Sequence, residues 1–169
     1  MTYEPWQPGM IMTQARLAAI SPVWTDWTPV WTTSTGANTP SLGNAVVTAR
    51  YAQSALTVYW RMTIVFGTTT NFGGGGGSDN WRFSAPVTAA AVTDVVGGGE
   101  AQDTSVAGSA GRVPLRPRLT TTTTIELEVS GGRVDSVAVT SAGLVDAVSP
   151  WTWANSDIIR AWGHYEAAA

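Results

Sequence analysis

The sequence predicts an all-β fold, and three observations lead to this prediction. Thr, Val and Trp are abundant while charged residues make up only 12% of the chain, a composition that favours strands. Alternating apolar and polar residues recur between turn signals spaced roughly ten residues apart. No run of about 18 apolar residues is present, so we expect no membrane insertion. We therefore expect an antiparallel β-sandwich, of which the jelly roll is one form, over residues 23–169.

The N-terminal arm, residues 1–22, is expected to hold one short helix. Pro5, Pro8 and Gly9 predict an extended, turn-rich start. Thr13 can cap a helix over residues 14–20, which Pro22 would end. A helix of two turns is marginal in isolation. We therefore expect the arm to dock on its own domain or on a partner.

The strongest strand signal covers residues 56–66, where apolar residues alternate with more polar ones and so share one face. We expect residues 46–51 to pair with it as a hairpin. Residues 23–33 should be an extended edge segment, because Pro29 is tolerated at a sheet edge. Gly97-Gly98-Gly99 is expected to break the apolar run of Val92, Val95 and Val96. The remaining expected strands and extended segments cover residues 80–85, 102–107, 119–129, 133–140, 150–154 and 157–165.

The composition excludes several kinds of site. The chain has no Cys, so it has no disulfide, no thiol nucleophile and no Cys-ligated metal. A net charge of −3 excludes a strongly basic nucleic-acid binder. His164 is the only His, and we interpret it as a hydrogen-bonded strand residue. The Gly run at 73–77 lacks the Lys and the helix of a phosphate-binding loop, so we interpret it as a surface turn. We expect no metal and no cofactor.

Two carboxylates have a spacing that glycoside hydrolysis can use. Glu126 and Glu128 would lie about 7 Å apart on one face of the expected strand 119–129. The rest of that face carries only Thr, so we interpret it as solvent-exposed. Asp79-Asn80 has the composition of a turn. We therefore expect no catalytic residues and a non-enzymatic protein.

Trp is the residue type that most suggests binding, because aromatic rings anchor interfaces and stack on sugars. Trp60 and Trp81 lie on inward faces of expected strands, so we expect them in the core. The Trp residues of less regular segments are expected at a subunit interface, with core packing and a sugar platform as open alternatives: Trp6, Trp24, Trp27, Trp31, Trp151 and Trp153. Low charge and nine Trp favour a stable homo-oligomer.

Several segments carry a resemblance to a known family: Trp27–Trp31, Leu42–Ala45, Arg50–Tyr51, Phe66–Thr69, Trp81–Pro86, Trp151–Asp157 and Gly163–Ala167, with Trp6–Gly9 in the arm. Together and in this order they resemble small β-sandwich domains of tailed-bacteriophage virion proteins, found on tail fibres and at virion surfaces. The chain departs from that family at residues 53–55, where a Gly is more usual after the Arg-Tyr pair. Residues 92–118 match nothing in it.

The resemblance implies a non-enzymatic structural protein of the virion, assembled in the host cytoplasm and released by lysis. The chain has no fibrous repeat, which favours a head-stabilising capsid decoration protein over a short tail-fibre or receptor-binding protein. The expected partners are further copies of the chain, as a homotrimer, and other virion proteins such as the major capsid or tail proteins. In a receptor-binding role, a host-surface glycan would join them. The alternative is a carbohydrate-binding module that uses exposed Trp residues.

Overall fold

The computed structural model describes residues 9–11, 13–14, 21–74, 79–92, 95–131 and 143–169. Trp6, the expected strand 133–140 and the expected helix beyond Gln14 lie outside these residues. The described residues form one short 3-10 turn (Gly108–Gly111) and nine strands: β1 (Thr25–Asp26), β2 (Trp31–Thr33), β3 (Val46–Ser54), β4 (Thr57–Val65), β5 (Trp81–Ser84), β6 (Gly97–Gln102), β7 (Arg112–Leu119), β8 (Thr124–Val129) and β9 (Ile158–Glu166).

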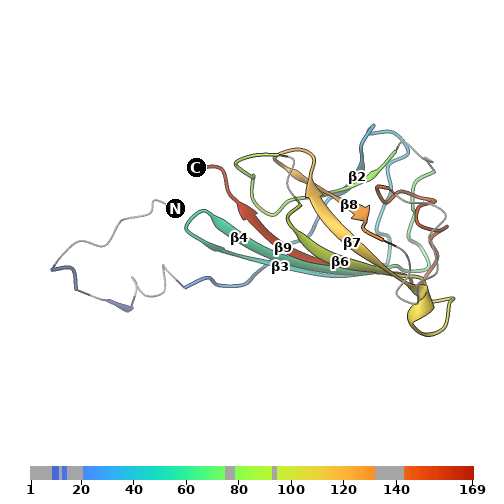
Figure 1. Cartoon of the computed structure of the whole chain (residues 1–169), viewed down its shortest axis with the longest axis horizontal. Helices are drawn as coiled ribbons and strands as arrows, with labels where there is room; N and C mark the ends of the chain where they lie inside the picture. Colours follow the sequence, from blue (N-terminus) through green and yellow to red (C-terminus); the bar gives the residue numbers. More distant parts are fainter. Residues whose placement is uncertain (1–8, 12, 15–20, 75–78, 93–94, 132–142) are drawn as a thin grey trace.

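All nine strands belong to one antiparallel sheet in the order β1-β3-β4-β9-β6-β7-β8-β5-β2. The all-β prediction is therefore confirmed, and the division into two sandwich layers stays a prediction. Strands β3, β4, β9 and β6 run side by side as the long part of the sheet, and β7 and β8 continue it beyond β6 (Figure 1).

The sheet is curled because its two edges are joined by a short link. Only residues 27–30 separate the edge strands β1 and β2, and such a link spans at most about 18 Å. The amide of Trp27 donates to the carbonyl of Ala49 at 3.0 Å, which ties one end of the link to β3. The amide of Ser84 donates to the carbonyl of Val30 at 2.9 Å, which ties the other end to β5. The predicted edge segment 23–33 thus supplies both edges.

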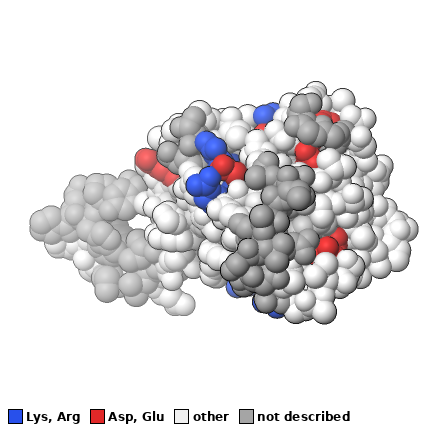
Figure 2. Space-filling view, turned by 45° about the vertical axis from the view of Figure 1, so that its right-hand side comes forward, with Lys and Arg blue, Asp and Glu red and all other residues white. Residues whose placement is uncertain are grey.

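The inward faces of the strands enclose the core. On β4 the predicted alternation is confirmed, since Val58, Trp60, Met62 and Ile64 are all buried. Beside them lies the inner aromatic cluster, which consists of Trp31, Phe66, Phe72, Trp81, Phe83 and Trp153. The ring centroids of Trp31 and Trp81 are 4.6 Å apart. On the side that Figure 2 shows, charged side chains form small groups separated by uncharged surface.

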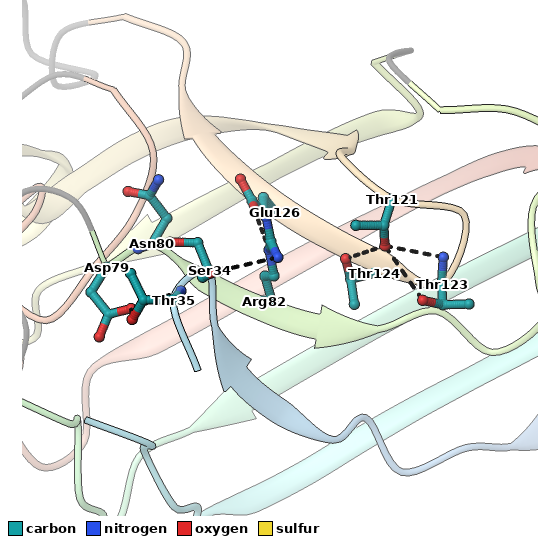
Figure 3. A network of polar contacts seen from close by, with 9 residues as sticks. All are labelled: Ser34, Thr35, Asp79, Asn80, Arg82, Thr121, Thr123, Thr124 and Glu126. Atoms are coloured by element: carbon teal, nitrogen blue, oxygen red, sulfur yellow. Dashed lines mark hydrogen bonds and ion pairs between the residues drawn. The ribbon is translucent and has the colours of Figure 1, made fainter. Parts of the chain in front are cut away.

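The prediction of a single long strand over residues 119–129 is wrong. Leu119 ends β7 and Thr124 begins β8, and the chain reverses between them so that the two strands pair. The hydroxyl of Thr121 lies 2.6 Å from that of Thr124 and accepts a hydrogen bond from the amide of Thr123 (Figure 3). Such local side-chain bonds compete with the strand ladder, so a run of Thr can turn as well as extend.

The break predicted at Gly97-Gly98-Gly99 is also wrong, as is the strand predicted over residues 102–107. The three glycines form the first half of β6, which ends at Gln102. The backbones of β6 and β9 approach closely there: a Cβ on Gly97 would overlap the carbonyl oxygen of Trp162, and one on Gly163 would overlap that of Val96. Glycine is therefore what allows this pair of strands to form.

Candidate functional site

The outward side chains of β3, β4 and β9 form rows across the sheet. Registered partners in antiparallel strands point to the same face. Tyr59 on β4 is the partner of His164 on β9, and Arg61 is the partner of Trp162. Arg61 is also the partner of Arg50 on β3, which in turn pairs with β1. Two neighbouring rows therefore carry aromatic and cationic side chains on the outside of the sheet.

We call this surface the outer aromatic face and define it by Trp24, Tyr59, Arg61, Trp162 and His164. The side chain of Trp162 is 54% exposed, that of Tyr59 42% and that of Trp24 40%. The rings of Tyr59 and His164 lie 6.3 Å apart between centroids, tilted by 40°. Large aromatic rings this exposed on neighbouring strands make this face a candidate binding surface.

Trp162 is held in place by a glycine on the next strand. A Cβ built on Gly98 would lie 3.4 Å from Cζ2 of the Trp162 indole and 3.6 Å from its Cε2. The indole therefore rests against the backbone of β6, where a Cβ would just touch it and a longer side chain would displace it. This contact positions the ring while more than half of the side chain stays open to solvent.

Arg61 is the unpaired cation of this face. Its guanidinium carbon lies 5.0 Å from the centre of the Trp24 ring, within the range of a cation–π interaction. No carboxylate among the described residues pairs with it. Its neighbours differ in this respect, because Arg50 pairs with Asp26 at 2.8 Å and Arg160 pairs with Glu100 at 3.1 Å.

His164 also borders a pocket of about 410 Å³ at the end of the sheet, lined by Ala90, Ala91, Val95, Val96, Leu119, His164, Tyr165 and Glu166. The phenol of Tyr165 donates a hydrogen bond to the carbonyl of Val87 at 2.6 Å and accepts one from its amide at 3.1 Å. Burial raises the pKa of Tyr165 to about 12. The phenol therefore stays protonated at neutral pH and serves as a structural anchor.

The carboxylates considered for catalysis are both engaged by arginines. Glu126, which we predicted on a solvent-exposed face, is buried, with only 2% of its surface exposed. It accepts a hydrogen bond from Nε of Arg82 at 2.5 Å, and a second nitrogen of Arg82 reaches the carbonyl of Ser34 (Figure 3). Glu128 pairs with Arg116 at 2.7 Å and with Arg118 at 3.3 Å. Neither carboxylate is placed to act as a free acid or base.

The other buried acids hold loops together. Asp79 accepts hydrogen bonds from the hydroxyl and the amide of Thr35, and the hydroxyl bond lowers its pKa (Figure 3). Asp157 accepts from Thr104, from the indole of Trp151 and from the amide of Ala154. Within the described ranges, no three His, Cys, Asp or Glu side chains gather where they could hold a metal ion. No helix there is long and apolar enough to cross a membrane.

The predicted Trp set divides among three environments. Trp31 and Trp153 are buried in the inner aromatic cluster, with 5% and 4% of their surface exposed, so for these two residues the structure favours the alternative of core packing over the expected interface. Trp27 and Trp151 are half-buried against the core, where Trp27 meets Trp60 edge-on. Only Trp24 of the described set lies on the outer aromatic face.

Sequence reasoning missed Trp162 and Tyr59. Alternation along the last strand places Trp162 on the same side as Ile158, Arg160 and His164, but it does not show that this side is the outer one. The signal was present in the composition of the two sides. One carries Arg and His, whereas the other carries Ile159, Ala161, Gly163 and Tyr165 and is inward.

Comparisons of the chain with family models, with curated proteins and with solved structures found no match. Function is therefore inferred from the residues and their arrangement.

Proposed function

We propose that this chain is a non-enzymatic structural protein of a tailed-bacteriophage virion, with its β-domain facing solvent. The observation that carries the proposal is that the segments resembling virion domains contact one another in the core. Trp31, Phe66, Trp81 and Trp153 come from four such segments, and all four rings lie in the inner aromatic cluster. Segments far apart in the sequence therefore build one core. This supports the proposal, because the segments that carry the resemblance contribute to one folded core.

A binding role without catalysis is supported by the state of the carboxylates. Glu126 and Glu128 are held by arginines, and Asp79 and Asp157 hold loops. General acid–base chemistry needs a carboxyl group that can reach a substrate. The exposed aromatic rings, in contrast, are suited to contact with a partner.

Self-association is supported by aliphatic side chains at the sheet edges. Val23 precedes β1, Val30 precedes β2 and Val46 begins β3, and each is more than 60% exposed. Exposed aliphatic side chains near edge strands are suited to burial against further copies of the chain. We propose a homotrimer that contacts other virion proteins, and a capsid decoration role ahead of a tail-fibre role.

Antibody–gold labelling of intact particles, from a phage that encodes this chain, tests the proposal. Label spread over the head is the expected result and would assign a decoration role. Label confined to the tail tip would retain the virion proposal but assign a tail-fibre or receptor-binding role. Particles without label would contradict it. Light scattering at micromolar concentration tests the trimer, whose mass should be three times the chain mass of 17.7 kDa.

The exposed indole of Trp162 favours a second candidate, a carbohydrate-binding module. A sugar ring presents an apolar C–H surface that stacks on an indole, and its hydroxyls need polar partners at the rim. Both are available beside Trp162. The two candidates are compatible, because a virion protein that binds a host-surface glycan would combine them.

A further inference from the structure

We propose that the outer aromatic face binds an acidic glycan, with sugar rings stacked on Trp162 and Tyr59 and a sugar carboxylate paired with Arg61. This inference rests on the second candidate function and names its ligand class and residues. It does not depend on where the chain lies in a virion.

The first support is the preformed stacking surface. Trp162 rests against Gly98 on the neighbouring strand, so its orientation is set before a ligand arrives. Its 54% exposure leaves a large part of the side chain open to solvent. A ring that is already positioned loses little conformational entropy on binding, which is why Trp and Tyr are efficient contact residues.

The second support is the placement of polar groups around the rings. Arg61 is the registered partner of Trp162, so the two side chains lie next to each other on one face. Arg160 and Glu100 form the next row, two residues further along their strands, at about 7 Å. Hydroxyls at the rim of a stacked sugar would therefore meet both donors and acceptors.

The third support is charge complementarity. Five of the seven described arginines pair with a carboxylate, whereas Arg61 pairs with none and lies over the Trp24 ring. That contact places a cation between two exposed indoles, one on either side of β4. A guanidinium binds a carboxylate in a directed, often bidentate geometry. A uronic acid or a sialic acid supplies that carboxylate on a ring that can stack.

Other ligands fit this face less well. Single-stranded nucleic acid also stacks on aromatic rings, but it needs a strongly positive groove, and this chain has a net charge of −3. The centre of a protein–protein interface is depleted in charge. Here one ion pair, Asp26 with Arg50, lies in the row of Trp162, and another, Glu100 with Arg160, lies in the next row.

The test is a printed array of uronate- and sialate-containing oligosaccharides, each beside its own methyl ester, probed with the full chain. We expect binding to at least one acidic member and roughly tenfold weaker binding to its ester. Equal binding to acid and ester would overturn the acidic-glycan inference while the carbohydrate-binding function stands. Binding to no member would overturn both, and the virion proposal would be unaffected.

Three variants then assign the residues. Arg61→Gln should bind acid and ester equally, and Trp162→Ala should bind both roughly tenfold more weakly. Gly98→Val should also weaken both, because its side chain displaces the indole. The control is Arg116→Gln, an exposed arginine on β7, which should bind as the unmodified chain does.

Unchanged glycan binding by Trp162→Ala would overturn the assignment. A fall in oligomer mass for the same variant would overturn it as well, because the face would then be an interface between copies. Circular dichroism of each variant separates these results from loss of folding.

Discussion

The aromatic residues of the core, including the inner aromatic cluster, and those of the outer aromatic face are the same residue types in opposite environments. On β4, Trp60 points inward and is 1% exposed, while its neighbour Tyr59 points outward and is 42% exposed. On β9, Tyr165 is inward and Trp162 outward. The inner rings contact one another, with centroids 4.6 Å apart for Trp31 and Trp81. The outer rings contact a glycine, an arginine and a histidine instead.

This difference shows that an abundance of Trp does not identify a binding surface. What distinguishes an aromatic side chain of the core from one available for binding is the face of the strand that it occupies and whether the rest of the chain covers that face. The inner cluster should therefore determine stability, whereas the outer face should determine binding and contribute little to stability.

The sharpest test of that division compares Trp81→Ala with Trp162→Ala. Trp81 is buried and contacts Trp31, Phe66 and Trp153. Its truncation should lower the free energy of unfolding by about 4 kcal/mol. Trp162→Ala should cost only about 1 to 2 kcal/mol, because about half of the side chain is already exposed. Urea unfolding curves measure both values. Equal losses would contradict the comparison.

The glycines of the β6–β9 pair provide a second contrast. A Cβ on Gly163 would overlap the carbonyl of Val96, and the backbone cannot yield without separating the strands. Gly163→Ala should therefore cost about 3 kcal/mol of unfolding free energy. Gly98→Ala would only touch the Trp162 indole and should change the free energy of unfolding by less than about 1 kcal/mol. Thermal unfolding of the two variants checks this, and the reverse order would refute the close approach of the strands.

Ion pairs should differ as the aromatic rings do: a buried pair should contribute more to stability than an exposed one. Glu126→Gln keeps the shape of the side chain but leaves Arg82 without its buried counter-ion, so we expect a loss of about 2 kcal/mol. Glu128→Gln alters a more exposed pair with Arg116 and Arg118 and should cost under about 1 kcal/mol. Denaturation in low and high salt measures both. Similar losses would indicate that burial of Glu126 does not matter for stability.

Much of the fold could be predicted from the sequence because alternation is a local property. The hairpin of β3 and β4, the last strand β9 and the edge position of residues 23–33 all follow from period-two patterns and Pro29. Thr121 and Gly98 illustrate what could not be predicted. A run of Thr is compatible with a turn as well as with a strand, so its sequence does not show where the chain reverses. The Gly run in β6 forms a strand only because β9 approaches it closely, which is a contact with a distant part of the sequence.

The candidate site was harder to predict for a related reason. Alternation shows which residues share a face, but not which face is covered by the rest of the chain. Glu126 was placed on the correct side of β8, yet that side is buried at Glu126 and paired with Arg82. Trp31 and Trp153 lie in segments without a clear alternation of apolar and polar residues, yet they pack in the core.

The smallest expected effect concerns the inward and outward tyrosines at alkaline pH. Burial raises the pKa of Tyr165 from 10.0 to about 12, so the folded state holds this proton more tightly than the unfolded chain. Its contribution to stability is therefore complete below pH 10 and is lost as the pH rises towards 12. The chain has no Lys, so Lys titration does not obscure this range.

Tyr165→Phe should lower stability by about 1 kcal/mol at neutral pH, through the lost hydrogen bonds to Val87, and should flatten the alkaline decline. Tyr59→Phe is the matched control, because Tyr59 lies on the outer aromatic face and its side chain is 42% exposed. It should leave both the neutral stability and the alkaline decline unchanged. Urea unfolding at a series of pH values measures the two curves. If Tyr59→Phe flattened the decline as much as Tyr165→Phe, the inner and outer aromatic residues would not differ in their role in stability.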